Sequence, residues 1–119
     1  MKIAITAQGS DPDSKVDQRF GRAYWLLFYD EASDSWEALE NTSARNALQG
    51  AGIQAAQQVS DQRAEVLITG VTGPKAFKAL NAAGIRVMHG ALGTAREALQ
   101  TYLQGGLIEA SAEMAVGAP

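Results

Sequence analysis

Two apolar runs separated by only five residues constrain the fold of this chain most strongly. Ala23–Tyr29 (AYWLLFY) is apolar on both faces, which is typical of a strand inside a sheet, and Ser35–Glu40 has the pattern of a second strand. The connecting segment, Asp30–Asp34 (DEASD), is too short to hold a crossover helix. The two strands must therefore pair antiparallel, which excludes a purely parallel α/β sheet.

The remaining periodicities predict a mixed sheet flanked by helices. The expected elements are strands over 1–7, 23–29 and 35–40, a helix over 51–60, a strand over 65–69, a helix from 74 to 84, a strand over 85–89 and a helix from 94 to about 105. This β-β-β-α-β-α-β-α order predicts an α/β fold with five strands in one domain over 1–107, followed by a flexible tail over 108–119. The residues expected to face the core from the helices are Ile53, Ala56, Val59, Phe77, Leu80, Leu99, Tyr102 and Leu103.

Composition limits the functions that the chain can have. Its 119 residues, 46% hydrophobic and 19% charged, suit one soluble globular domain. The absence of cysteine excludes disulfides, thiolate nucleophiles and the usual ligands of iron–sulfur clusters and structural zinc. A net charge of −3 gives no support to a nucleic-acid partner. No apolar run is long enough to cross a membrane, and MKIAITAQGS lacks a secretory core, so we expect a cytoplasmic protein.

Enzyme signatures are incomplete. The meander-first order matches a ribonuclease H-like architecture, but the two-metal reaction needs carboxylates on the first and fourth strands, and only Glu65 lies there, at the wrong end. The turn Thr69–Phe77 (TGVTGPKAF) differs from a phosphate-binding P-loop because Pro74 removes a donor and no Ser or Thr follows Lys75. Ser14, Thr72 and Thr94 have no visible base, so we predict a protein without enzymatic activity.

Two turns at the carboxyl ends of strands are candidate anion sites. The turns Thr69–Phe77 and His89–Glu97 combine glycines with a helix start, where free N–H groups attract negative charge, although tight βα turns also explain the glycines. The candidate residues in them are Gly70, Gly73, Gly93 and Thr94, and Thr94 with Glu97 also has the pattern of a capping box.

Side chains that could bind a metal are few. His89, the only histidine, is a candidate metal ligand or general base, with a structural hydrogen-bonded imidazole as the alternative. Asp11, Asp13 and Asp17 in the long loop 8–21 could bind a cation or simply favour turns.

Four motifs in the chain resemble those of a known family. VDQRFGRAYWLLFYD, GAGIQAAQ, VLITGVTGPKAFKAL and AAGIRV…G…GTAREAL stand in the order found in dinitrogenase iron-molybdenum cofactor biosynthesis proteins, over Met1 to about Leu107. The chain is similar to the short stand-alone members. The resemblance implies a ribonuclease H-like fold without nuclease activity. It also implies a carrier of the iron-molybdenum cofactor or its iron–sulfur precursors, with cofactor-assembly proteins as partners.

The resemblance also directs attention to the segment Arg19–Arg22. Cofactor-carrying members have a histidine before the Phe-Gly pair, and Arg19 stands there in this chain, next to Phe20, Gly21 and Arg22. A guanidinium is not an ordinary metal ligand, but it pairs with anions, so we expect this segment to face an anionic cluster. A regulatory or protein-interaction domain that binds another small anion at the same face is the alternative, and Arg19 favours it. If a nitrogen of the chain coordinates metal, His89 must supply it. No pattern assigns an oligomeric state.

Overall fold

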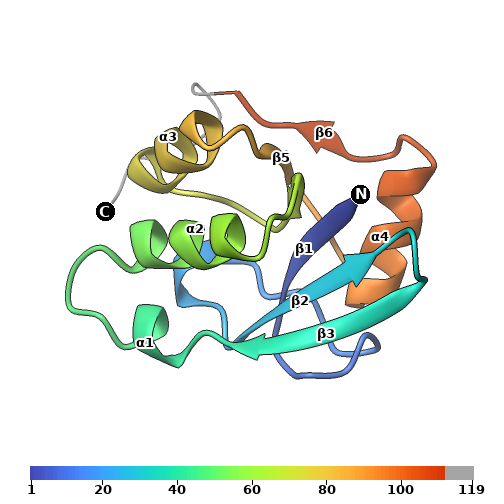
Figure 1. The fold of residues 1–119 in the computed structure, drawn as a ribbon, viewed down its shortest axis with the longest axis horizontal. Coiled ribbons are helices and arrows are strands. Elements are labelled where there is room, and N and C mark those ends of the chain that lie inside the picture. The colour runs from blue at the N-terminus through green and yellow to red at the C-terminus, as the bar shows by residue number, and fades with distance from the viewer. Residues whose placement is uncertain (112–119) are drawn as a thin grey trace.

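The computed structural model, which describes residues 1–111, contains the antiparallel hairpin that the sequence requires. β2 (Trp25–Asp30) pairs with β3 (Ser35–Glu40) along its full length, and β1 (Lys2–Ala7) lies antiparallel on the other side of β2. β4 (Val66–Ile68) and β5 (Arg86–His89) then continue the sheet parallel to β1. The predicted mixed sheet is therefore confirmed (Figure 1).

The sheet has six strands, so the predicted count of five is wrong. β6 (Ile108–Glu109) pairs antiparallel with β5, and the strand order is β3-β2-β1-β4-β5-β6. From the sequence these two residues are expected in the tail, because a segment of two residues has no detectable period. Their position depends on the free edge of β5, where the N–H of Ala110 donates to the carbonyl of Val87 at 2.7 Å. Residues 112–119, the rest of the expected tail, lie outside the described residues.

The helices cover both faces of the sheet. The helical elements are the 3-10 turn η1 (Phe20–Arg22), α1 (Thr42–Arg45), α2 (Ala51–Asp61), α3 (Pro74–Ala82) and α4 (Ala95–Leu103). Three of them, α2, α3 and α4, match the predicted helices, whereas η1 and α1 are too short to give a periodic signal. The helices α2 and α3 lie together on one face, and α4 lies on the other (Figure 1).

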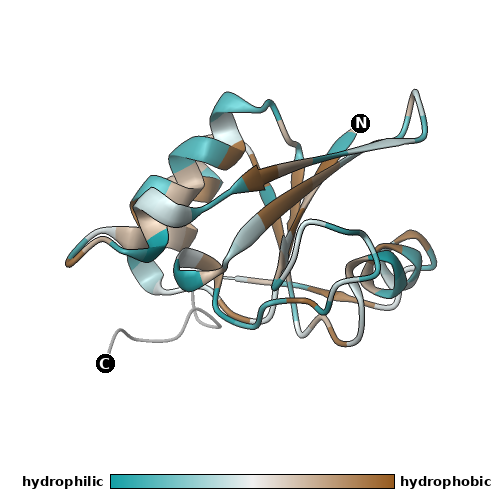
Figure 2. Cartoon of the chain, turned by 90° about the horizontal axis from the view of Figure 1, so that it is seen from below, coloured by the Kyte–Doolittle hydropathy of each residue, from teal (hydrophilic) through white to brown (hydrophobic). Residues whose placement is uncertain are grey.

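Alternate residues of the strands build two core layers. In β1, Ala4 faces α2 and α3, while Ile3 and Ile5 face α4. Figure 2 shows apolar residues concentrated on the central strands and hydrophilic residues on the outer surfaces of the helices. The chain thus fixes the sheet from both sides, and its carboxyl-end loops are held above a packed core. None of the helices within residues 1–111 is long and apolar enough to cross a membrane.

Two residues expected in the core are exposed. Ile53 on α2 is 47% exposed and Leu103 at the end of α4 is 45% exposed. The core face of α2 consists of small residues and Val59, because α2 lies so close to α3 that a Cβ on Gly52 would be 2.8 Å from the Cβ of Ala76. This close approach turns Ile53 outward. The expected burial of Ala56, Val59, Leu80 and Leu99 is confirmed, and Phe77 and Tyr102 are partly buried against the core.

Candidate functional site

The long loop after β1 connects the two candidate anion turns. The N–H of Val16 donates to the carbonyl of Gly93 at 2.9 Å, and the N–H of Val71 donates to the carbonyl of Gln18 at 2.9 Å. Gly70 is required at this crossing because any Cβ would collide with the backbone of Gln18. The loop is therefore an ordered layer over the carboxyl ends of β1, β4 and β5, and it places the segment Arg19–Arg22 beside the turn after β4.

The start of α4 is occupied by the chain itself. The capping box predicted at Thr94 is confirmed, and the next N–H groups donate to carbonyls of the long loop. The pairs are Glu97 N to Thr94 Oγ1 (3.1 Å), Thr94 N to Glu97 Oε1 (2.9 Å), Ala95 N to Ser14 O (2.9 Å) and Arg96 N to Pro12 O (2.9 Å). Gly93 and Thr94 thus form a junction between loop and helix, with their helix N–H groups already paired.

The start of α3 differs from that of α4. Gly73 is the residue before the helix and Pro74 its first residue, with no side chain capping the end. Within residues 1–111, the N–H groups of Lys75 and Ala76 have no hydrogen-bond partner. Of the two turns that the sequence singles out, the one before α3 alone keeps free helix N–H groups in the part of the chain that the structure describes.

The Phe-Gly pair anchors η1. The ring of Phe20 is buried in the core, and the backbone N–H of Phe20 donates to the carbonyl of Val71 at 3.2 Å. A Cβ on Gly21 would be 2.7 Å from the backbone nitrogen of Gly52, so only glycine allows η1 to lie against the start of α2. The pair therefore has a packing role, and it leaves the flanking side chains of Arg19 and Arg22 at the surface.

These arginines border a cationic hollow, which we call the arginine hollow. Its lining residues are Asp17, Arg19, Arg22, Tyr24 and Arg45, and its volume is about 350 Å³. Three guanidinium groups and one carboxylate give it a net positive charge in a chain whose total charge is −3. The geometry is suited to an anion that guanidinium N–H groups can surround.

Each lining residue has a distinct local contact. The guanidinium carbon of Arg45 lies 3.7 Å from the centre of the Tyr24 ring. Nη1 of Arg22 donates to two backbone carbonyls, of Arg45 at 2.7 Å and of Ala47 at 2.8 Å. The carboxylate of Asp17 accepts from the backbone N–H of Tyr24 at 3.3 Å. The backbone N–H of Arg19 donates to Asp17 at 3.4 Å, and its exposed guanidinium forms no hydrogen bond or ion pair within residues 1–111.

Sequence reasoning found part of this hollow. The sequence predicts Arg19 and Arg22 but not Arg45 or Tyr24, and it predicts Asp17 as a cation ligand or a turn-forming residue. Arg45 ends the four-residue helix α1, which has no periodic signal, and its approach to Tyr24 depends on the tertiary fold. The sequence had no signal that would have identified Arg45.

His89 lies outside the arginine hollow. It is 7% exposed at the end of β5, and its Nε2 is 2.8 Å from the hydroxyl oxygen of Thr72. Burial lowers the pKa of its imidazole from the ordinary 6.5. Among residues 1–111 there is no group of three or more histidine, cysteine or acidic side chains that could hold a metal ion. The structure thus brings Arg19 and Arg22 together, and it does not bring His89, Gly93 or Thr94 to the same hollow.

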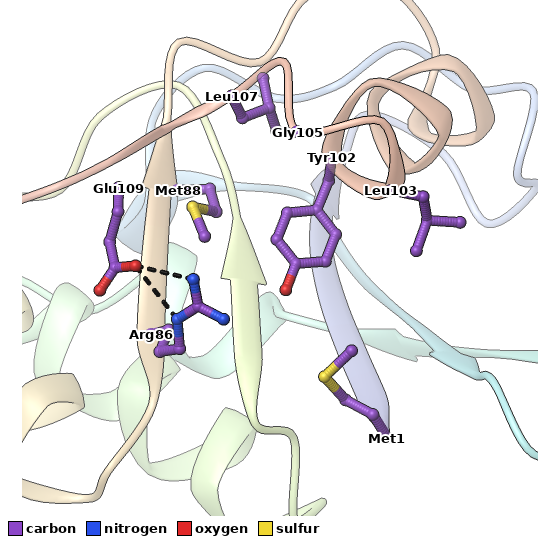
Figure 3. A pocket seen from close by; sticks show the side chains of 8 residues that line it. All are labelled: Met1, Arg86, Met88, Tyr102, Leu103, Gly105, Leu107 and Glu109. Atoms are coloured by element: carbon purple, nitrogen blue, oxygen red, sulfur yellow. Dashed lines mark hydrogen bonds and ion pairs between the residues drawn. The ribbon is translucent and has the colours of Figure 1, made fainter.

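A second, larger cavity lies at the amino ends of β1 and β5, beside the end of α4. Its volume is about 500 Å³, and it is lined by Met1, Arg86, Met88, Tyr102, Leu103, Gly105, Leu107 and Glu109 (Figure 3). Figure 3 shows the ring of Tyr102 directed from α4 into this space. Its cation, Arg86, is paired with Glu109 at 2.8 Å. With a neutralised charge, this cavity offers less to an anion than the smaller arginine hollow does.

Comparison with known proteins places the chain in a family. Residues 1–105 match the family model described as dinitrogenase iron-molybdenum cofactor. The apo form of the orange protein from Desulfovibrio gigas is 43% identical, with a TM-score of 0.90 and 92% of each chain covered. A NifB-type protein from Thermotoga is 35% identical, with a TM-score of 0.81 and 91% of each chain covered.

A more distant structure shares the fold alone. A protein from Methanocaldococcus jannaschii described as a dinitrogenase is 16% identical, with a TM-score of 0.68, and the match covers 93% of this chain and 95% of that one. No curated protein sequence matches the chain significantly.

Proposed function

Because the chain belongs to the dinitrogenase iron-molybdenum cofactor family, we propose that it binds and carries an anionic metallocofactor and catalyses no reaction on it. The cargo would be the iron-molybdenum cofactor or one of its iron–sulfur precursors, received from and delivered to proteins of cofactor assembly. The single observation that carries this proposal is the arginine hollow, which lies beside the Phe-Gly motif and has an excess of positive charge.

The residues of the hollow suit ion pairing better than coordination. Guanidinium groups donate hydrogen bonds to anionic sulfur and oxygen atoms, but they do not bind a metal ion directly. The chain has no cysteine, and Asp17 accepts backbone hydrogen bonds. A cluster held by its outer anionic atoms can leave without breaking a metal–ligand bond, which is what a carrier requires. The meander-first sheet also supports the ribonuclease H-like assignment that we propose for the fold.

The proposal is tested by anaerobic titration of the full chain with isolated iron-molybdenum cofactor, followed by absorption and EPR spectra. We expect saturable binding that weakens as salt increases, because exposed charges are screened. The Arg19→Gln variant should bind at least roughly tenfold more weakly, since a hydrogen bond to a charged group contributes about 1.5–3 kcal/mol and about 1.4 kcal/mol is a factor of ten. The matched control is Arg86→Gln, which removes the same charge at the other end of the sheet and should leave the affinity unchanged.

Two results would contradict this assignment. A chain that forms no complex with the cofactor is not its carrier. If Arg19→Gln binds like the unaltered chain while His89→Gln loses the spectrum of the complex, the metal site is at His89.

The alternative function, a regulatory domain that binds another small anion, is favoured by Arg19 at the position of the family's histidine. It is tested with molybdate and phosphate in the same titration format, with calorimetric detection. Binding of one of these ions that depends on Arg19, together with no binding of the cofactor, would support the alternative.

A further inference from the structure

We propose that the arginines of the hollow have different roles: Arg45 contacts the anion together with Arg19, whereas Arg22 is a positioning residue that acts through Arg45. This inference rests on the proposed function, because it assigns roles within the site that would bind the anion. It also adds two residues, Arg45 and Tyr24, that the sequence motifs do not identify.

Arg22 is committed to the backbone. Its Nη1 donates to the carbonyls of Arg45 and Ala47, at 2.7 and 2.8 Å, and these carbonyls lie at the end of α1. The last carbonyls of a helix have no hydrogen-bond donor within the helix and carry partial negative charge. A guanidinium supplies the missing donors and a compensating positive charge. The side chain of Arg22 is partly buried, and its planar group is fixed in orientation by these two bonds.

Arg45 is held in place but keeps its donors. The backbone carbonyl of Arg45 accepts a hydrogen bond from Arg22, which fixes the backbone at this position. The guanidinium carbon of Arg45 lies over the Tyr24 ring, 3.7 Å from its centre. Stacking on a ring occupies the π face of the guanidinium and leaves the N–H groups at its edge free. Within residues 1–111 these N–H groups form no hydrogen bond or ion pair.

Asp17 connects the backbone of Arg19 to that of Tyr24, the residue whose ring Arg45 covers. Its carboxylate accepts from the backbone N–H of Tyr24 at 3.3 Å and of Arg19 at 3.4 Å. The guanidinium groups of Arg19 and Arg45, which form no hydrogen bond or ion pair within residues 1–111, therefore line the same hollow as Asp17 and Arg22. This arrangement offers two guanidinium groups to an anion, while Arg22 fixes the backbone of Arg45 and Ala47.

A double-mutant cycle separates the two roles. Affinity for isolated iron-molybdenum cofactor is measured anaerobically for Arg22→Gln, Arg45→Gln and the double variant. We expect Arg45→Gln to bind roughly tenfold more weakly, as a lost charge-assisted hydrogen bond predicts. Arg22→Gln should also weaken binding, but in the Arg45→Gln background it should have almost no further effect. Equal fold-changes for Arg22→Gln in both backgrounds would show that Arg22 contacts the anion itself, and would overturn the proposal, as would normal binding by Arg45→Gln.

Conservative variants give the opposite pattern at the two positions. Lysine at position 22 can still donate to two carbonyls, so Arg22→Lys should restore the affinity lost in Arg22→Gln. Arg45→Lys should not restore the affinity lost in Arg45→Gln, since a lysine ammonium lacks the planar group that stacks on Tyr24 and donates at its edge.

A readout without ligand keeps this inference separate from the proposed function. The ring resonances of Tyr24 in NMR spectra report on the stacked guanidinium of Arg45. We expect Arg22→Gln to shift them toward their positions in Arg45→Gln, and Arg22→Lys to leave them unchanged. If Arg45→Gln shifts these resonances but Arg22→Gln does not, Arg22 does not position Arg45, whether or not the chain binds the cofactor. If the unaltered chain binds no cofactor but the NMR pattern holds, the proposed function and the contact role of Arg45 fail while the positioning contact stands.

Discussion

Phe20 and Gly21 show how one short motif combines packing with presentation of charge. The buried ring of Phe20 ties η1 to the core, and the missing side chain of Gly21 lets η1 touch the start of α2. Their neighbours Arg19 and Arg22 consequently emerge on the same surface. At the scale of single residues, the family motif is therefore a structural anchor whose flanking positions present positive charge at the surface.

Replacement of Gly21 by alanine should destabilise the fold. The new Cβ would be 2.7 Å from the nitrogen and 2.8 Å from the Cα of Gly52, and two backbones cannot separate without moving α2. We expect a loss of roughly 1–3 kcal/mol in the free energy of unfolding, measured by urea denaturation. Gly9→Ala is the matched control, because its Cβ meets only side-chain atoms of Ser14, the hydroxyl at 2.6 Å, which can rotate away, and the Cβ at 3.3 Å. Equal losses for the two variants would contradict the close approach.

His89 should titrate below its ordinary pKa of 6.5, because burial disfavours its charged form. As the pH falls below about 6.5, the unfolded chain takes up the proton before the folded chain does. The stabilisation from a neutral His89 is therefore complete above that pH and decreases below it. The chain has one histidine, so a single imidazole signal in NMR gives its pKa directly. In urea denaturation, the difference in unfolding free energy between the unaltered chain and His89→Gln should shrink as the pH falls. A pKa at or above 6.5 would contradict this environment.

At the scale of elements, the chain uses its own loop to close one helix end and leaves another open. The N–H groups at the start of α4 pair with Glu97, Thr94 and the long loop, whereas the start of α3 has no such partners within residues 1–111. Glycine-rich turns that look alike in the sequence are thus different in the structure. The difference arises because the loop after β1 is long enough to cross one turn and end on the other.

Removal of the cap at Thr94 should loosen α4. In Thr94→Ala the N–H of Glu97 loses its partner at 3.1 Å, and we expect the free energy of unfolding to fall by about 1 kcal/mol. Thr42→Ala is the control, since that exposed hydroxyl bonds only to an exposed glutamate side chain, and it should change stability by less than about 0.5 kcal/mol. Urea denaturation measures both, and hydrogen exchange should show the faster opening confined to α4 and the adjoining loop.

At the scale of the whole molecule, two concave surfaces at different ends of the sheet have different character. The arginine hollow is formed by the loop between β1 and β2 together with the end of α1, and its net charge is positive. The larger cavity lies at the amino ends of β1 and β5, and its arginine is paired with a glutamate. Size alone would favour the larger cavity. Charge favours the hollow, because an anion needs N–H donors that no carboxylate already occupies.

The limit of the domain can be tested by truncation, and we propose that the domain extends beyond Leu107 and includes β6. Ending the chain after Leu107 removes β6, the hydrogen bond from Ala110 to Val87 and the Arg86–Glu109 pair. The few hydrogen bonds lost predict a destabilisation of roughly 1–3 kcal/mol. Thermal and urea unfolding of the shortened and the unaltered chain measure this, and equal stability would place β6 outside the domain.

Local pattern predicted most of the architecture. The hairpin of β2 and β3, the parallel strands β4 and β5, and the helices α2 to α4 follow from periodicity and from the length of one turn. The same reasoning misplaced Ile53 and Leu103, since the side of a helix that faces the core depends on how closely its neighbour approaches. It also missed β6, whose two residues are a strand only because β5 offers a free edge.

The sequence by itself determined the mixed sheet, the ordered loop-and-helix succession and the family, because these depend on periodicity, turn length and motifs that are local in the chain. Only the tertiary structure decided which charges meet. Arg45 joins Arg19 and Arg22 across more than twenty positions of sequence through backbone carbonyls and the Tyr24 ring, and His89 turns inward to Thr72. Such contacts arise from packing between elements, and no spacing of residues along a single element encodes them.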